Sequence, residues 1–296
     1  MESTAVGGRF GPLWKWFVGA GLALASAAGA SALTLHSEKS GPTDLEISGL
    51  LAGVPAGESR WLRWADLRAL PTRELEVEGE FLPGRQRVTL VFLQDVLDRL
   101  PLAPGADTVT AVCHDGYAGV FTREFTEKWR PYVVLEINGV GPEQWPPAGM
   151  TFNPGPYVLT ASEHVAPGVG AVLDLPHKQP WGVTAIKLVR YADEFAPFMK
   201  GEWAALSERA ERGRELWVNS CYSCHKGPGE VVGGTKGGRP FAVLRAYAEH
   251  NKKYFRDYVR NPQGLNPSAK MTAHPHYTDE QLAELMAFIV GEKPKS

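Results

Sequence analysis

Two cysteines and a histidine stand close together in this 296-residue chain, in the stretch CYSCH at residues 221–225. Two thiols one helical turn apart can each add to a vinyl group of a haem, and the adjacent histidine can then ligate the iron. A zinc half-site or a redox dithiol would need a second cysteine pair or a thioredoxin-like setting, and the chain has only Cys113 besides. The motif therefore predicts one covalent haem c, attached at Cys221 and Cys224 with His225 as proximal ligand.

The sequence around this motif resembles class I cytochromes c from about Glu208 to Glu292. The resemblance implies that Gly213 and Trp217, upstream of the motif, lie on a helix that crosses the last helix of the chain. The last helix presents one apolar stripe, formed by Leu282, Leu285, Phe288 and Ile289. Its start is marked separately by Thr278 with a glutamine three residues later, the pattern of a capping box.

The same resemblance implies a distal iron ligand from the loop before the last helix. Met271 follows a lysine there, as does the distal methionine of the family, and its soft, neutral thioether favours ferrous iron. Thr272 stands where the family usually has a proline. His274 and His276 remain alternative ligands, and a core packing role is the alternative for Met271.

The segment between the motif and Met271 predicts one or two short helices, with aromatic residues that would line the haem crevice. In class I cytochromes c a proline carbonyl orients the proximal histidine. Pro228 and Pro240 are both candidates for that proline.

Length and charge indicate a second folded region before the cytochrome-like segment. The chain is too long for one small cytochrome domain, and its 44% hydrophobic and 22% charged residues are typical of globular proteins. Counting Lys, Arg, Asp and Glu, the net charge is +4 from Leu206 onward and −6 before it. A mildly basic haem domain suits an acidic redox partner protein, although an ordinary solvated surface gives the same balance. Nothing in the charge pattern indicates nucleic acid binding.

Near the N-terminus, Arg9 and Lys15 precede an uncharged run from Trp16 to Leu35 that contains small-residue cleavage sites. Haem is attached to CxxCH motifs outside the cytoplasm, so we expect an export signal here. Residues 1–35 therefore predict a cleaved signal peptide, with a retained membrane anchor as the alternative. The expected location is the periplasm or the outer face of the cytoplasmic membrane.

Residues 43–192 combine short β-rich runs with Gly- and Pro-rich loops, and helices are expected mainly at Trp64–Leu70 and Leu93–Leu100. This pattern predicts a mixed α+β domain. A short connector leads from it to the all-α cytochrome domain predicted at residues 205–296. The expected fold class of the chain is α+β.

The first domain resembles the molybdopterin-binding domain of the sulfite oxidase family in the phrases VTAVCHDGY, YVVLEINGV, NPGPYVLTA and HKQPWGVTAIKLVRY. The resemblance implies Cys113, in CHDGY, as a thiolate ligand of a molybdenum cofactor. Two observations argue against such a site. The domain is short for the family, and no twin arginine is present to direct the export of a folded protein. The basic candidates for a pterin phosphate are also few: Lys178, Lys187 and Arg190. A small buried cysteine at a strand end is the other interpretation of Cys113.

These expectations describe an exported monohaem c-type cytochrome that transfers single electrons and is fused to a non-catalytic, sulfite-oxidase-like domain. The alternative is a molybdenum-dependent oxidoreductase, with Cys113 as the molybdenum ligand and the haem as a built-in relay. A haem sensor would need a weak or missing distal ligand, and Met271 argues against it.

Overall fold

The computed structural model describes residues 32–78, 82–172, 178–230, 233–234 and 237–295. Residues 32–296 form one compact unit. The export segment expected at residues 1–35 lies outside the described residues except for its last four. Within the described ranges, no helix is long and apolar enough to cross a membrane.

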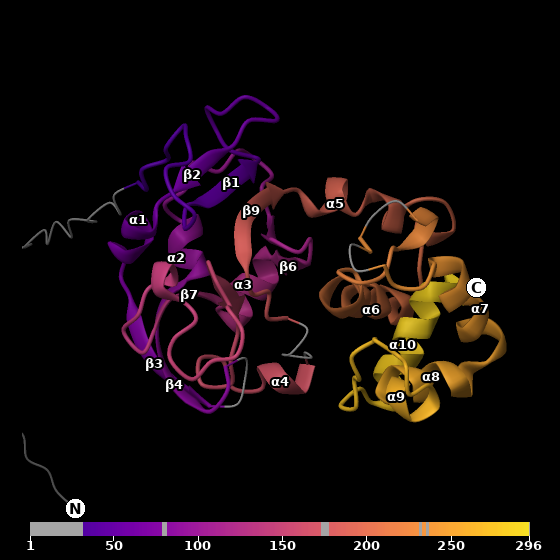
Figure 1. Ribbon diagram of the computed structural model, residues 1–296. Coiled ribbons are helices and arrows are strands. Elements are labelled where there is room, and N and C mark those ends of the chain that lie inside the picture. Colours follow the sequence, from indigo (N-terminus) through magenta and orange to yellow (C-terminus); the bar gives the residue numbers. More distant parts are fainter. Residues whose placement is uncertain (1–31, 79–81, 173–177, 231–232, 235–236, 296) are drawn as a thin grey trace, which may run out of the picture. The chain divides into compact units, whose positions relative to one another are not determined.

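Two β-sheets dominate the first part of the chain (Figure 1). The larger sheet has the strand order β2-β1-β9-β5-β6, with β1 at Leu45–Gly49, β2 at Arg60–Leu62, β5 at Thr108–Cys113, β6 at Ala118–Thr122 and β9 at Val183–Val189. Its β1 and β9 are parallel, and its other pairs are antiparallel. The smaller, antiparallel sheet has the order β3-β4-β7-β8, with β3 at Arg73–Glu78, β4 at Arg85–Phe92, β7 at Tyr132–Ile137 and β8 at Val158–Thr160. Short helices connect the strands: α1 (Trp64–Arg68), α2 (Leu93–Leu97), α3 (Arg123–Trp129), η1 (Pro142–Gln144) and α4 (Val169–Val172).

The strands predicted from β-rich runs are confirmed at β3, β4, β5, β7, β8 and β9. The two predicted helices are also present as α1 and α2, each shorter than expected. Strands β1, β2 and β6 and helix α3 were not expected. Each is at most seven residues long, too short for apolar periodicity to separate it from a loop.

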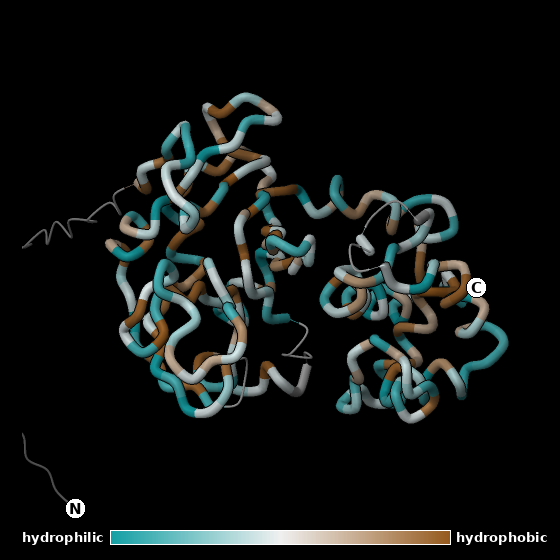
Figure 2. The backbone as a smooth tube through the Cα atoms, viewed as in Figure 1, coloured by the Kyte–Doolittle hydropathy of each residue, from teal (hydrophilic) through white to brown (hydrophobic). Residues whose placement is uncertain are grey.

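The sheets bury two apolar clusters. One includes Ile47 and Ile186 of the larger sheet together with Val133 and Leu159 of the smaller sheet, and the other includes Val88 and Val158 of the smaller sheet. Hydrophobic residues are brown along the strands in Figure 2. Removing these side chains from water supplies the main stabilisation of the sheets.

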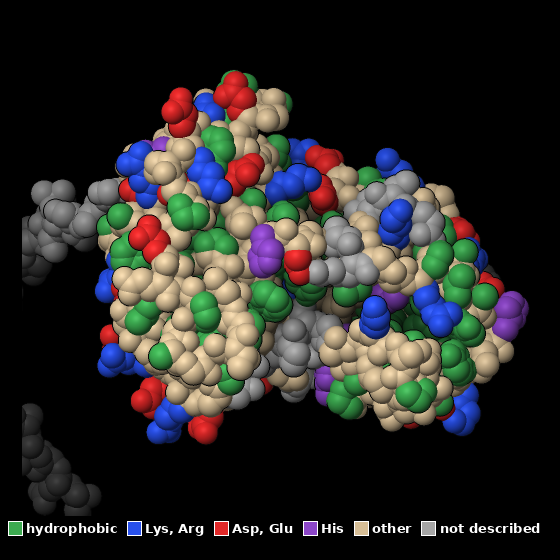
Figure 3. Space-filling view, viewed as in Figure 1, with side chains coloured by type: hydrophobic (Ala, Val, Ile, Leu, Met, Phe, Trp, Pro, Cys, Tyr) green, Lys and Arg blue, Asp and Glu red, His purple; other side chains and the backbone are tan. Residues whose placement is uncertain are grey.

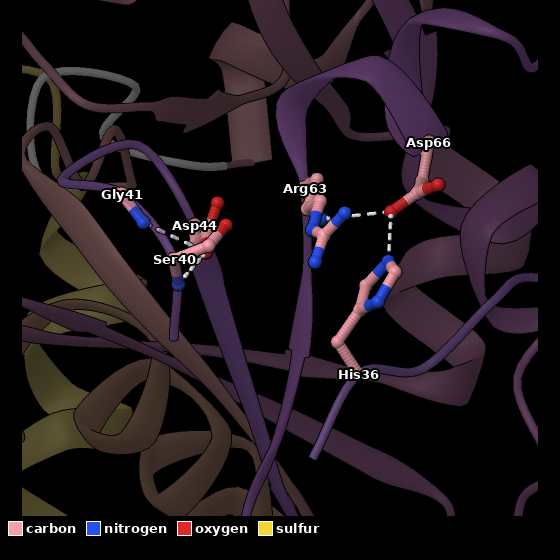
Figure 4. A network of polar contacts seen from close by, with 6 residues as sticks. All are labelled: His36, Ser40, Gly41, Asp44, Arg63 and Asp66. Carbon is pink, nitrogen blue, oxygen red and sulfur yellow. Dashed lines mark hydrogen bonds and ion pairs between the residues drawn. The ribbon is translucent and has the colours of Figure 1, made fainter. Parts of the chain in front are cut away.

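Polar contacts order the segment before β1, and one of them ties it to α1 (Figure 4). Asp44 accepts hydrogen bonds from the Ser40 backbone (2.6 Å), the Ser40 hydroxyl (2.9 Å) and the Gly41 backbone (3.1 Å). Burial by itself raises the pKa of Asp44, but these hydrogen bonds lower it, and the net direction is downward. Nearby, His36 contacts Asp66 at 3.0 Å. The network orders the chain at the entry to the larger sheet.

After β9 the chain becomes helical. The connector contains the short helices α5 (Tyr191–Glu194), η3 (Ala196–Met199) and η4 (Gly201–Trp203). The helices that follow are α6 (Glu208–Leu216), η5 (Trp217–Cys221), η6 (Pro228–Glu230), α7 (Phe241–His250), α8 (Lys252–Arg260), α9 (Pro262–Leu265) and α10 (Asp279–Val290). We call α6 to α10 the helical region. The strands and helices together confirm the α+β class, while the predicted domain limits of 43–192 and 205–296 stay predictions.

The first and last helices of the helical region cross at a glycine. A Cβ atom at Gly213 of α6 would lie 1.9 Å from the carbonyl oxygen of Glu284 and 3.0 Å from Cβ of Phe288, both on α10. Only a residue without a side chain permits this approach. The start of α10 also follows the sequence pattern, since Thr278 and Gln281 form a reciprocal capping box with bonds of 2.9 and 3.1 Å.

Candidate functional site

Local structure places the CYSCH motif at the end of a helix. Ser207 caps α6 by accepting a hydrogen bond from the Ala210 backbone. At Trp217 the helix widens into the π-helical turn η5, which ends at Cys221. Such turns are frequent at functional sites because they redirect side chains within a continuous helix.

The residues singled out in the sequence meet at one cavity of about 340 Å³, which we call the Cys221 cavity. Its lining includes Cys221, Cys224, His225, Met271 and the alternative ligand His274. Aromatic residues of the intervening helices also line it, namely Tyr247, Tyr254, Phe255 and Tyr258. His276 contacts Tyr277 with its ring but is not among the residues that line the cavity. Figure 3 shows Lys and Arg side chains beside hydrophobic ones over the helical region, and Arg239 and Lys270 line the cavity.

His225 is oriented by a main-chain carbonyl. Its Nδ1 lies 3.3 Å from the carbonyl oxygen of Arg239, so Nδ1–H donates and the Nε2 lone pair stays available for a metal. The acceptor is thus neither Pro228 nor Pro240, although Arg239 directly precedes Pro240. Burial lowers the pKa of His225, which favours the neutral imidazole that a metal ion needs. A side chain at Gly238 would collide with this ring, since its Cβ would lie 2.5 Å from Nδ1.

Met271 is held through its backbone. Gln263 of α9 donates hydrogen bonds from Nε2 to the carbonyl oxygens of Ala269 (3.0 Å) and Met271 (2.8 Å). These contacts fix the loop that carries the thioether to the cavity. His274 is 4% exposed and stacks on Tyr277 with ring centroids 5.2 Å apart.

Trp217 forms the inner wall of the Cys221 cavity. Its ring packs against Phe241 (5.3 Å), Phe288 (5.9 Å) and His225 (6.1 Å) between centroids. Its indole Nε1 is buried and has no hydrogen-bond partner among the described residues. A buried donor without an acceptor costs about 1 to 3 kcal/mol, so a bound group with an acceptor would be favoured here. Two thiols, a neutral imidazole, a thioether and aromatic walls fit a haem.

The structure shows where Cys113 and the basic side chains expected to bind a pterin phosphate lie. Cys113 is the last residue of β5 and is 3% exposed within the apolar cluster that both sheets share. Lys178 is buried and bonded to other groups, Lys187 pairs with Glu194 at 3.0 Å, and the Arg190 guanidinium pairs with a neighbouring carboxylate. None of these three basic side chains is therefore available to a pterin phosphate without giving up its present contacts.

Two comparisons with known proteins bear on the identity of the chain. Residues 210–292 match the cytochrome c family model. Over 108 residues the chain is also 30% identical to cytochrome c oxidase subunit 2 of Alkalihalophilus pseudofirmus. That alignment covers 33% of this chain and 31% of the relative.

The family-model match confirms the cytochrome c domain expected at the C-terminal end, and the family implies a covalently bound haem c there. The predicted likeness of the sheet region to sulfite oxidases stays a prediction. Sequence reasoning did not find three parts of the cytochrome c site: the Arg239 carbonyl, Gln263 and the Trp217 indole N–H. No short motif signals any of them.

Proposed function

We propose that this protein is an exported monohaem cytochrome c that transfers single electrons, located in the periplasm or at the outer face of the cytoplasmic membrane. The observation that carries the proposal is the convergence of Cys221, Cys224, His225 and Met271 on one cavity within the region that matches cytochrome c. The relative named as a cytochrome c oxidase subunit is consistent with electron transfer. The partner is a redox protein.

Each side chain has a separate task in this proposal. Cys221 and Cys224 would attach the haem through thioethers, and His225, held by the Arg239 carbonyl, would ligate the iron. Met271, on a loop anchored by Gln263, would supply the second iron ligand. The bound haem supplies a reversible one-electron couple. The aromatic walls and Trp217 exclude water, which favours the less charged ferrous state.

For the sheet region we propose a non-catalytic role. It resembles the sulfite oxidase family around Cys113, but the basic side chains expected to hold a pterin are engaged elsewhere. The competing function, a molybdenum oxidoreductase that uses Cys113 as its metal ligand, predicts stoichiometric molybdenum.

Metal and haem analysis tests both functions in one preparation. Protein expressed with haem-maturation machinery, in medium supplied with molybdate, should contain one covalent haem per chain and little or no molybdenum. A reductive titration should proceed in a single one-electron step. Absence of covalent haem would contradict the cytochrome function. Stoichiometric molybdenum that disappears in Cys113→Ser would establish the oxidoreductase instead.

Replacing the distal ligand should change the haem spectrum without detaching the haem. In Met271→Ala the weak far-red sulfur-to-iron band of the oxidised protein should vanish. The midpoint potential should fall by on the order of 0.1 V, within the roughly 0.8 V range that axial ligands span. Met199→Ala removes a half-buried methionine that does not line the cavity and should keep the band. A band retained in Met271→Ala and lost in His274→Ala would transfer the ligand role to His274.

A further inference from the structure

A buried lysine connects the larger sheet to the turn that precedes the haem-binding cysteines. Lys178 is 1% exposed, and its Nζ donates hydrogen bonds to the carbonyl oxygen of Val120 on β6 and to Oδ1 of Asn219, the latter at 2.6 Å. Asn219 belongs to η5, which ends at Cys221. We call residues 217–225, which comprise η5 and the CYSCH motif, the attachment segment. One ammonium group therefore joins β6 to the attachment segment.

The attachment segment has a second hydrogen bond to the same strand. Ser223, between the two cysteines of the motif, donates from its hydroxyl to the carbonyl oxygen of Ala118. Ala118 and Val120 also belong to the apolar cluster of the helical region, together with Tyr222. The attachment segment is thus fixed on β6 by polar contacts at two points and by apolar packing between them.

The surroundings of Lys178 contain no carboxylate partner among the described contacts. Both acceptors are neutral, and the ammonium lies 5.0 Å and 4.7 Å from the ring centroids of Phe121 and Phe125. Burial lowers the pKa of Lys178 to about 7. Among the described residues, the titratable groups on the elements packed against it are the exposed side chains Arg123, Glu124, Glu127 and Lys128 on α3, and Cys221 on η5, whose sulfur becomes a thioether once haem is attached.

We propose that Lys178 is a positioning residue of the haem site and couples proton uptake to reduction of the haem. The proposal rests on the proposed cytochrome function. A positive charge held in the protein interior favours the reduced, less positive iron, because interior charges are screened less than surface charges. The midpoint potential therefore falls as the pH rises through the titration of Lys178, and the deprotonated amine binds Asn219 and Val120 more weakly.

The test is the pH profile of the midpoint potential in the haem-loaded protein, between about pH 5.5 and about pH 9. In the wild type the potential should decline most steeply near neutral pH, and Lys178→Met should lose that decline. Lys178→Gln keeps an amide donor and should hold the potential near the value that the wild type has at high pH. Lys187→Met removes a half-exposed lysine that pairs with Glu194 and should retain the wild-type profile.

Unfolding measurements give an independent readout. The pKa of Lys178 is about 7 in the folded protein, below the ordinary lysine value of 10.5. Between these two pH values the unfolded chain binds more protons than the folded protein does. Lys178 therefore makes the free energy of unfolding increase with pH in this range. Lys178→Met and Lys178→Gln should lose this contribution.

Three outcomes would overturn the proposal. If the midpoint potential of both Lys178 variants differed from that of the wild type by the same amount at every pH, the role of Lys178 would be purely structural. Identical profiles in the wild type and both variants would show no coupling. Wild-type protein without covalent haem would contradict the proposed function itself, and this proposal with it.

Discussion

A chain carrying Cys221→Ala and Cys224→Ala should contain no covalently bound haem. Each thioether needs a sulfur at the position of a haem vinyl group, and both thiols line the Cys221 cavity at the end of η5. Haem staining after denaturing electrophoresis measures the attachment directly, because only covalent haem stays with the unfolded chain. The expected change is from one haem per chain to none.

Cys113→Ala is the matched control, since it removes the third cysteine from a different part of the fold. Cys113 lies in the core of the larger sheet, so this variant should retain full haem staining and lose only packing energy. Haem staining that survives in the double variant, or disappears in Cys113→Ala, would contradict the assigned attachment sites.

Gly213→Val should unfold the helical region or destabilise it by more than about 3 kcal/mol. The first added atom would lie 1.9 Å from the carbonyl oxygen of Glu284 on α10. That oxygen belongs to helix backbone, so it cannot move aside as a flexible side chain could. Urea unfolding followed by circular dichroism should show a large fall in the midpoint.

The control for helix propensity is Glu215→Val, at an exposed position of the same helix. It introduces the same β-branched residue without a collision, so it should lower the free energy of unfolding by about 0.7 kcal/mol or less. Equal losses in the two variants would show that propensity, and not the crossing of α6 and α10, explains the effect.

Much of the site was predictable because its information is local in the sequence. The spacing of Cys221, Cys224 and His225 specifies which atoms can meet a haem, and Thr278 with Gln281 marks the start of α10 within four residues. A π-helical turn at Trp217 and the length of the short strand β6 carry no comparable signal. Local patterns of three to five residues therefore identified the haem chemistry and the last helix.

The sequence by itself determined the α+β class, the CYSCH motif and the presence of a methionine and two histidines in the distal loop. Only the tertiary structure decided which groups surround them. The Arg239 carbonyl contacts His225, which is 14 residues away in the sequence, and Lys178 contacts Asn219, which is 41 residues away. Such contacts depend on how the loops and strands between them fold, because backbone carbonyls are chemically alike and a lone lysine has no spacing pattern.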